Sequence, residues 1–146
     1  MAGKNKQDYE VIVFKKRQLF LFDEIESCLA EEIVEKLWAL DHQNHNPITL
    51  FINSPGGSVS DGFAIIDTML GIASPVITVI TGEACSMAGL ISVAGNKRFI
   101  TENSYWMGHS MTGGSYDYIA KASARMEYLK TLQNRIDTLD HYDGSR

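Results

Sequence analysis

The sequence predicts an α/β fold in which helices flank a largely parallel β-sheet. Short apolar runs alternate along the chain with segments whose apolar residues recur every three or four positions. The first pattern is typical of strands and the second of amphipathic helices. Strands that alternate with helices through short connections are typical of a parallel sheet. The length of 146 residues suits one compact unit, so we expect a single domain over residues 1–146.

The composition argues against several functional classes. The formal net charge is −5, which gives no basic face for nucleic acid. Lys15, Lys16 and Arg17 form the only dense basic run, and we expect these side chains to be solvated beside a strand. No apolar run approaches the roughly 18 residues of a membrane span. The N-terminus lacks the apolar core of a secretion signal.

The two cysteines suggest a reducing compartment, because they make no disulfide framework. We therefore expect a cytoplasmic or equivalent location. Cys85 has small or apolar neighbours, which favours a buried, inert thiol over a nucleophile.

The first third of the chain predicts a flexible N-terminus over residues 1–8, followed by a strand and a helix. "VIVFKKRQLFLF" (11–22) is rich in branched and aromatic residues, which indicates one or two strands. The next apolar residues have the spacing of an amphipathic helix: Leu29, Ile33, Leu37 and Leu40. A polar loop, "HQNHNP" (42–47), follows, and we expect His42 and His45 within it to be solvated.

The middle of the chain predicts two strand–turn–helix units. "ITLFI" (48–52) is a short apolar strand, "NSPGGSVSDG" (53–62) interrupts it with Pro and Gly, and Phe63, Ile66 and Met69 or Leu70 then indicate a helix. "VITVI" (76–80) is another buried strand, followed by a turn at Ser86 and a helix to about Ala94. "KRFIT" and "SYWMGH" predict two further short strands.

A long amphipathic helix is predicted over residues 116–140, with no strand after it. Its apolar stripe is Ile119, Ala122, Met126, Leu129, Leu132, Ile136 and Leu139. This stripe either packs on the core of its own domain or forms an interface with another chain, and the pattern does not decide between the two.

Ser86, in "GEACSMAG" (82–89), has two interpretations. A serine before a helix is most often a cap. It is also where an acyl-transfer enzyme can hold a nucleophile, because the N–H of Met87 would lie at the positive end of the helix. Ligands of parallel sheets gather at the carboxyl ends of strands, and Gly57 and Ser86 both follow such ends. His109, at the end of "SYWMGH", is either an ordinary strand-end residue or a general base.

Four segments together resemble the proteolytic subunit of the ATP-dependent Clp protease, the ClpP family. They are "INSPGGSVSDGFAIIDTM" (52–69), "GEACSMAG" (82–89), "AGNKRFITENS" (94–104) and "MGH" (107–109). The similarity runs from about Tyr9 to the end. It implies a ClpP/crotonase-like sheet with flanking helices and a long C-terminal handle helix.

The resemblance also implies the activity and the residues that perform it. Ser86 would be the nucleophile, His109 the general base, and the amides of Gly57 and Met87 the oxyanion hole. In this family the handle interlocks two rings of subunits, which would place an oligomer interface at Ile119, Met126, Leu129, Leu132 and Ile136. An AAA+ unfoldase supplies ATP hydrolysis in the family, so we expect no metal or nucleotide cofactor on this chain.

One catalytic group of the family has no counterpart here. The third triad acid is an aspartate beyond the point where this sequence ends, so its replacement is unknown. We expect Asp137, Asp140 and Asp143 to lie on a solvated helix face and Asp117 to be a first-turn acid. Two hypotheses follow: a working serine endopeptidase subunit, or an impaired ClpP-like protein that binds a complete ClpP and modulates it.

Overall fold

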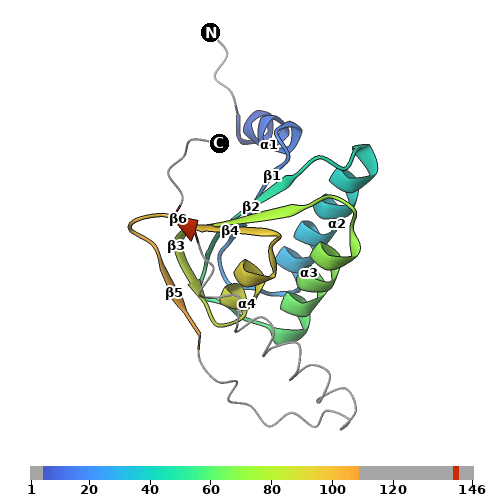
Figure 1. The fold of residues 1–146 in the computed structure, drawn as a ribbon. Helices are drawn as coiled ribbons and strands as arrows, with labels where there is room; N and C mark the ends of the chain where they lie inside the picture. Colours follow the sequence, from blue (N-terminus) through green and yellow to red (C-terminus); the bar gives the residue numbers. More distant parts are fainter. Residues whose placement is uncertain (1–4, 109–139, 142–146) are drawn as a thin grey trace, which may run out of the picture.

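The computed structural model describes residues 5–108 and the backbone of Asp140 and His141. Six strands form one sheet in the order β1-β2-β3-β4-β6, and β5 pairs with β3 off this path. Every recorded pairing is parallel. Figure 1 shows α2, α3 and α4 side by side on one face of the sheet. The predicted α/β class and parallel sheet are therefore confirmed.

The N-terminal segment differs from the prediction, because helix α1 (Lys6–Lys15) replaces both the end of the flexible tail and the first half of the expected strand. Asn5 and Asp8 form a reciprocal capping box that satisfies the first free amides of the helix. Only β1 (Gln18–Phe22) is extended. The branched residues of the segment favour strands only weakly, and the cap overrides that preference.

Arg17 marks the change of direction between α1 and β1, and it is not a solvated charge as predicted. Its backbone has a φ of 57°, which belongs to the left-handed region. Its guanidinium donates hydrogen bonds to Ser74 Oγ and to four carbonyl oxygens, those of Leu40, Asn44, Asn46 and Pro47. Arg17 therefore holds three segments together, while Lys15 and Lys16 are exposed.

The next two units follow the prediction closely. Helix α2 (Ser27–Gln43) is followed by β2 (Ile48–Ser54), and helix α3 (Val59–Gly71) returns along the same face. The buried apolar residues of α2 are Ala30, Ile33, Leu37 and Leu40. The amphipathic pattern thus identified the buried face of this helix.

Strand β3 (Val76–Cys85) is longer than predicted and leads directly into α4 (Met87–Ala94). Two short strands follow, β4 (Lys97–Ile100) and β5 (Tyr105–Met107). The first half of β3 pairs with β4 and its last residues pair with β5. This second pairing brings the segment before His109 beside the end of β3.

The C-terminal prediction is corrected at one place. Asp140 and His141 form a short strand, β6, which pairs with Phe99 and Ile100 of β4. Asp140 is therefore not on a helix, and a strand does follow the expected handle. The open edge of β4 offers unpaired backbone groups, and even two residues can satisfy some of them. The rest of the predicted handle, residues 116–139, lies outside the described residues.

The sheet has two unlike faces. Toward the helices, β2 and β3 contribute residues without exposed surface, among them Leu50, Ile52 and Ile80. On the opposite face, one transverse row is apolar across four strands: Phe20, Phe51, Val79 and Phe99. Phe20 and its neighbour Phe22 are each 43% exposed, so this face is only partly covered. No described helix is long and apolar enough to span a membrane.

Candidate active site

Ser86 lies at a sharp turn between β3 and α4, at the carboxyl end of the longest strand. Its backbone dihedrals are φ 52° and ψ −120°. A non-glycine residue in this region costs about 1–3 kcal/mol and is held there by its surroundings. A strained serine between a strand and a helix is the arrangement that exposes a nucleophile above a sheet.

The side chain of Ser86 does not do what a capping serine does. Ser86 occupies the N-cap position of α4, yet its hydroxyl makes no capping hydrogen bond. Its backbone is fixed instead, since the Ser86 N–H donates to Met107 O at 2.8 Å and Leu90 N–H donates to Ser86 O at 3.2 Å. The residue itself is half-buried. The hydroxyl is thus available while the backbone is fixed at both ends.

The glycine pair after β2 lies against this turn. A Cβ added to Gly56 would come within 2.7 Å of Cys85 O and 2.9 Å of Ser86 Cβ. Gly56 also has a φ of 99°, so only glycine fits here in both conformation and space. The sequence had singled out Gly57, and the structure adds Gly56 as the residue that touches Ser86. The "PGG" motif is the signal that could have identified it.

Gly57 is held by the loop before α2. The Ile25 N–H donates to Gly56 O, and the Ser58 N–H donates to Ile25 O, both at 2.8 Å. These bonds form an isolated parallel bridge between Ile25 and Gly57. A Cβ on Gly57 would meet Ile25 O at 2.3 Å, so this loop is in close backbone contact.

Two backbone amides near Ser86 are available as donors. Met87 is the first residue of α4, where no preceding turn offers a carbonyl oxygen. Gly57 is exposed. Within the described part of the chain, neither N–H is bonded to an acceptor. The Met87 amide lies 3.1 Å from the position of a Cβ added to Gly56. The two donors therefore come from adjacent loops at the same edge of the sheet.

A polar cluster of Glu83, Cys85 and Tyr105 lies beside the turn. Cys85 is buried, as expected, and burial raises the pKa of its thiol above the usual range, with a further contribution from Glu83. A protonated, buried thiol is a poor nucleophile. The hydrogen bond from the Tyr105 hydroxyl to Glu83 raises the pKa of Tyr105 to about 12. Tyr105 is therefore a neutral donor at physiological pH.

His109 and the five expected interface residues lie outside the described residues, so their roles remain predictions. β5 ends at Met107, and His109 follows after Gly108. The other two predicted loop histidines are exposed, as expected. His42 Nδ1 contacts Trp38 O at 2.8 Å, and His45 Nδ1 contacts Asp41 Oδ1 at 3.1 Å.

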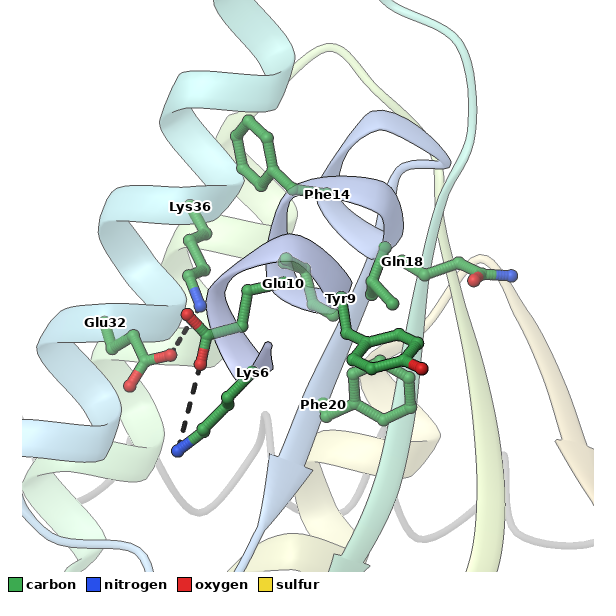
Figure 2. A pocket seen from close by; sticks show the side chains of 10 residues that line it. Lys6, Tyr9, Glu10, Phe14, Gln18, Phe20, Glu32 and Lys36 are labelled. Carbon is green, nitrogen blue, oxygen red and sulfur yellow. Dashed lines mark hydrogen bonds and ion pairs between the residues drawn. The ribbon is translucent and has the colours of Figure 1, made fainter. Parts of the chain in front are cut away.

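A separate groove of about 530 Å³ lies between α1, β1 and α2. Figure 2 shows the rings of Tyr9 and Phe20 on one side of it and Phe14 on the other. Its remaining lining residues are Lys6, Glu10, Val13, Gln18, Leu19, Glu32 and Lys36. None of the residues around Ser86 contributes to it. The groove is therefore distinct from the candidate active site.

Comparison with known proteins gives one consistent result. The family model described as "Clp protease" matches residues 2–142. The ATP-dependent Clp protease proteolytic subunits of three strains of Streptococcus thermophilus are each 39% identical over 138 residues, which cover 90% of this chain and 70% of those proteins. The crystal structure of the ClpP protease catalytic domain from Plasmodium falciparum superimposes with a TM-score of 0.80 at 36% identity. That match covers 92% of this chain and 77% of the other.

Proposed function

Because this chain belongs to the Clp protease family, we propose that it is a serine endopeptidase subunit that hydrolyses peptide bonds of unfolded polypeptides. The observation that carries the proposal is the Ser86 turn. Acyl transfer to a serine requires an available hydroxyl and hydrogen-bond donors for the oxyanion. The turn offers a Ser86 hydroxyl that makes no capping hydrogen bond, a strained backbone and two adjacent amides.

In the proposed reaction, Ser86 Oγ attacks the carbonyl carbon of the scissile peptide bond. His109 takes the hydroxyl proton and then gives it to the leaving amine, so that an acyl-enzyme forms at Ser86. Water, deprotonated by the same histidine, then attacks the ester, and the histidine returns that proton to Ser86 Oγ as the acid product leaves. Catalytic competence rests on how well His109 is oriented without an assigned acid partner.

The amides of Gly57 and Met87 would stabilise the negative charge on the carbonyl oxygen of each tetrahedral intermediate. Their donors belong to backbone that is already fixed, so little reorganisation is needed during the reaction. Met87 adds the positive end of the α4 dipole. The sequence resemblance and this arrangement support the same assignment.

The proposal includes the setting in which the subunit works. Its substrates would be polypeptides, its first partners other ClpP-type subunits, and a Clp-type AAA+ unfoldase would deliver the substrate. We propose assembly through the apolar stripe of residues 119–136 and a cytoplasmic location. The proposed reaction uses side chains, backbone amides and water, with no cofactor.

The test is fluorophosphonate labelling of the purified protein, followed by intact-mass measurement. We expect one label per chain at Ser86, and none in the Ser86→Ala variant. Ser58→Ala is the matched control, because Ser58 is also an N-cap serine at the same edge of the sheet and should label normally. Labelling that persists in Ser86→Ala would show that the nucleophile is assigned wrongly.

A second candidate function is favoured by the two exposed phenylalanines of β1, Phe20 and Phe22. An impaired ClpP-like subunit would bind a complete ClpP and modulate it, and contiguous exposed apolar surface is typical of such interaction sites. Here a folded protein would show no label but would co-elute with a full-length ClpP and change its rate of peptide hydrolysis. Absence of both co-elution and self-association would exclude this candidate.

A further inference from the structure

Trp106 joins the two elements that the proposed reaction must hold together. It is the middle residue of β5, and its half-buried indole packs onto α4. The Trp106 Nε1–H donates to Gly89 O at 3.3 Å. Gly89 lies in the first turn of α4, the helix that begins immediately after Ser86.

Glycine at position 89 is explained mainly by the close approach of the indole. A Cβ there would lie 3.0 Å from Trp106 Nε1, 3.2 Å from Trp106 Cε2 and 3.3 Å from the carbonyl oxygen of Ala84, all closer than ordinary contact. The backbone of Gly89 is helical and needs no glycine for its conformation, since its φ is not positive. The absent side chain therefore serves the close approach of the ring.

The six-membered part of the same indole meets Gly108. A Cβ on Gly108 would come within 2.4 Å of Trp106 Cη2 and 2.9 Å of Cζ3. Gly108 also has no positive φ, so its conformation does not require glycine. The indole thus contacts two glycines, one in the first turn of the helix that follows Ser86 and one directly before His109.

We propose that Trp106 is a positioning residue, whose indole sets the spacing between the Ser86 turn and the backbone that leads to His109. This inference rests on the proposed function. The backbone already joins the two elements, through the pairing of β5 with the end of β3 and through the bond from Ser86 N–H to Met107 O. The indole adds a side-chain contact between β5 and α4, which the backbone pairing with β3 does not provide.

The test is the rate of fluorophosphonate labelling at Ser86 as a function of pH. In the unmodified chain we expect the rate to rise with pH as a histidine loses its proton, near the ordinary histidine pKa of about 6.5. Trp106→Val should lower the rate near neutral pH by about a hundredfold, because displacement of a catalytic group by about 1 Å costs that much. Labelling of the variant should then follow hydroxide concentration, without the histidine inflection.

A double-mutant cycle separates positioning from a loss of stability. Gly108→Ala should slow labelling by about tenfold when Trp106 is present, but by less than about twofold in the Trp106→Val background, where the ring it would strike is gone. Trp106→Phe keeps a ring in place and should retain most of the rate. Trp38→Phe, at the exposed tryptophan of α2, should leave the rate unchanged.

Three outcomes would contradict the positioning role of Trp106. Equal losses at every pH, together with a lower melting temperature, would reduce Trp106 to a stabilising role and overturn the proposal. Normal labelling of folded Trp106→Val would overturn it as well. If the folded, unmodified chain is not labelled, the proposed function fails and the positioning role fails with it.

Discussion

Asp41 shows how a single carboxylate can hold a loop. It lies near the end of α2, almost fully buried, and its Oδ1 accepts hydrogen bonds from Ser74 N and Ser74 Oγ, both at 2.7 Å. The Ser74 hydroxyl is the main cause that lowers the pKa of Asp41 to about 2, and His45 contributes further. The guanidinium of Arg17 reaches the same Ser74 hydroxyl. The end of α2 and the loop before β3 are thus joined.

We expect Asp41→Asn to lower the melting temperature at neutral pH, because the amide is a weaker acceptor than the carboxylate. The folded-state pKa is lowered, so the stabilisation is present above about pH 4 and is lost as the pH falls toward 2. The difference in melting temperature between the variant and the unmodified chain should therefore shrink over that range. Asp67→Asn, an exposed position on α3, is the control and should change little.

Gly56 is the residue at which an added methyl group should lower the reactivity of Ser86 most. We expect Gly56→Ala to reduce Ser86 labelling by about a hundredfold or more, because the new Cβ strikes Cys85 O and Ser86 Cβ and disturbs the adjacent Met87 donor. The positive φ adds strain.

Gly71→Ala is the matched control for that substitution. It lies at the end of α3 with nothing within 4 Å of the added Cβ and no positive φ. It should leave labelling unchanged and stabilise the helix by about 0.4–1 kcal/mol. Similar labelling of both variants would mean that Gly56 does not shape the site.

At the scale of elements, α1 depends on its cap more than on packing. None of its residues is fully buried, and Tyr9 is 58% exposed. The exposed surface of α1 carries the ion pair of Lys6 with Glu10 (Figure 2), which contributes little to stability. The capping box of Asn5 and Asp8 is the main local feature that favours the helix over the strand its sequence suggested.

We therefore expect Asn5→Ala to destabilise α1 by about 1 kcal/mol. None of the residues of α1 is fully buried, so the helix can open without unfolding the rest of the domain. The effect should therefore appear as faster amide hydrogen exchange within Lys6–Lys15, with a nearly unchanged global melting temperature. Asn103→Ala, in the exposed loop before β5, is the control. Unchanged exchange in α1 would show that its contacts with β1 and α2 hold it instead.

At the scale of the whole molecule, the sheet buries one face under three helices and leaves the other partly open. The helix-side face contains the core, while Phe20 and Phe22 remain exposed on the opposite face. An assembly of several chains is the ordinary way to cover such a surface. The apolar stripe proposed as an interface, residues 119–136, would likewise need to be covered by another chain.

We expect the paired substitutions Met126→Gln and Leu129→Gln to weaken self-association while the domain stays folded. Loss of two apolar contacts at an interface centre commonly costs about 2–4 kcal/mol, a shift that sedimentation velocity detects. Lys130→Gln lies off the apolar pattern and should leave the assembly intact. If the pair unfolds the protein, circular dichroism will show it, and the stripe then belongs to the core.

The sequence by itself determined most of the α/β order. It identified the buried stripe of α2, the strands from β2 to β5 and the position of Ser86, because periodicity and turn residues act over a few neighbouring positions. Only the tertiary structure decided that residues 11–15 are helical, that Arg17 binds distant carbonyl groups and that Asp140 joins the sheet. The contact of Gly56 with the Ser86 turn and that of Trp106 with α4 were likewise hidden. These features depend on groups far apart in sequence, and local patterns carry no information about which distant backbone will approach.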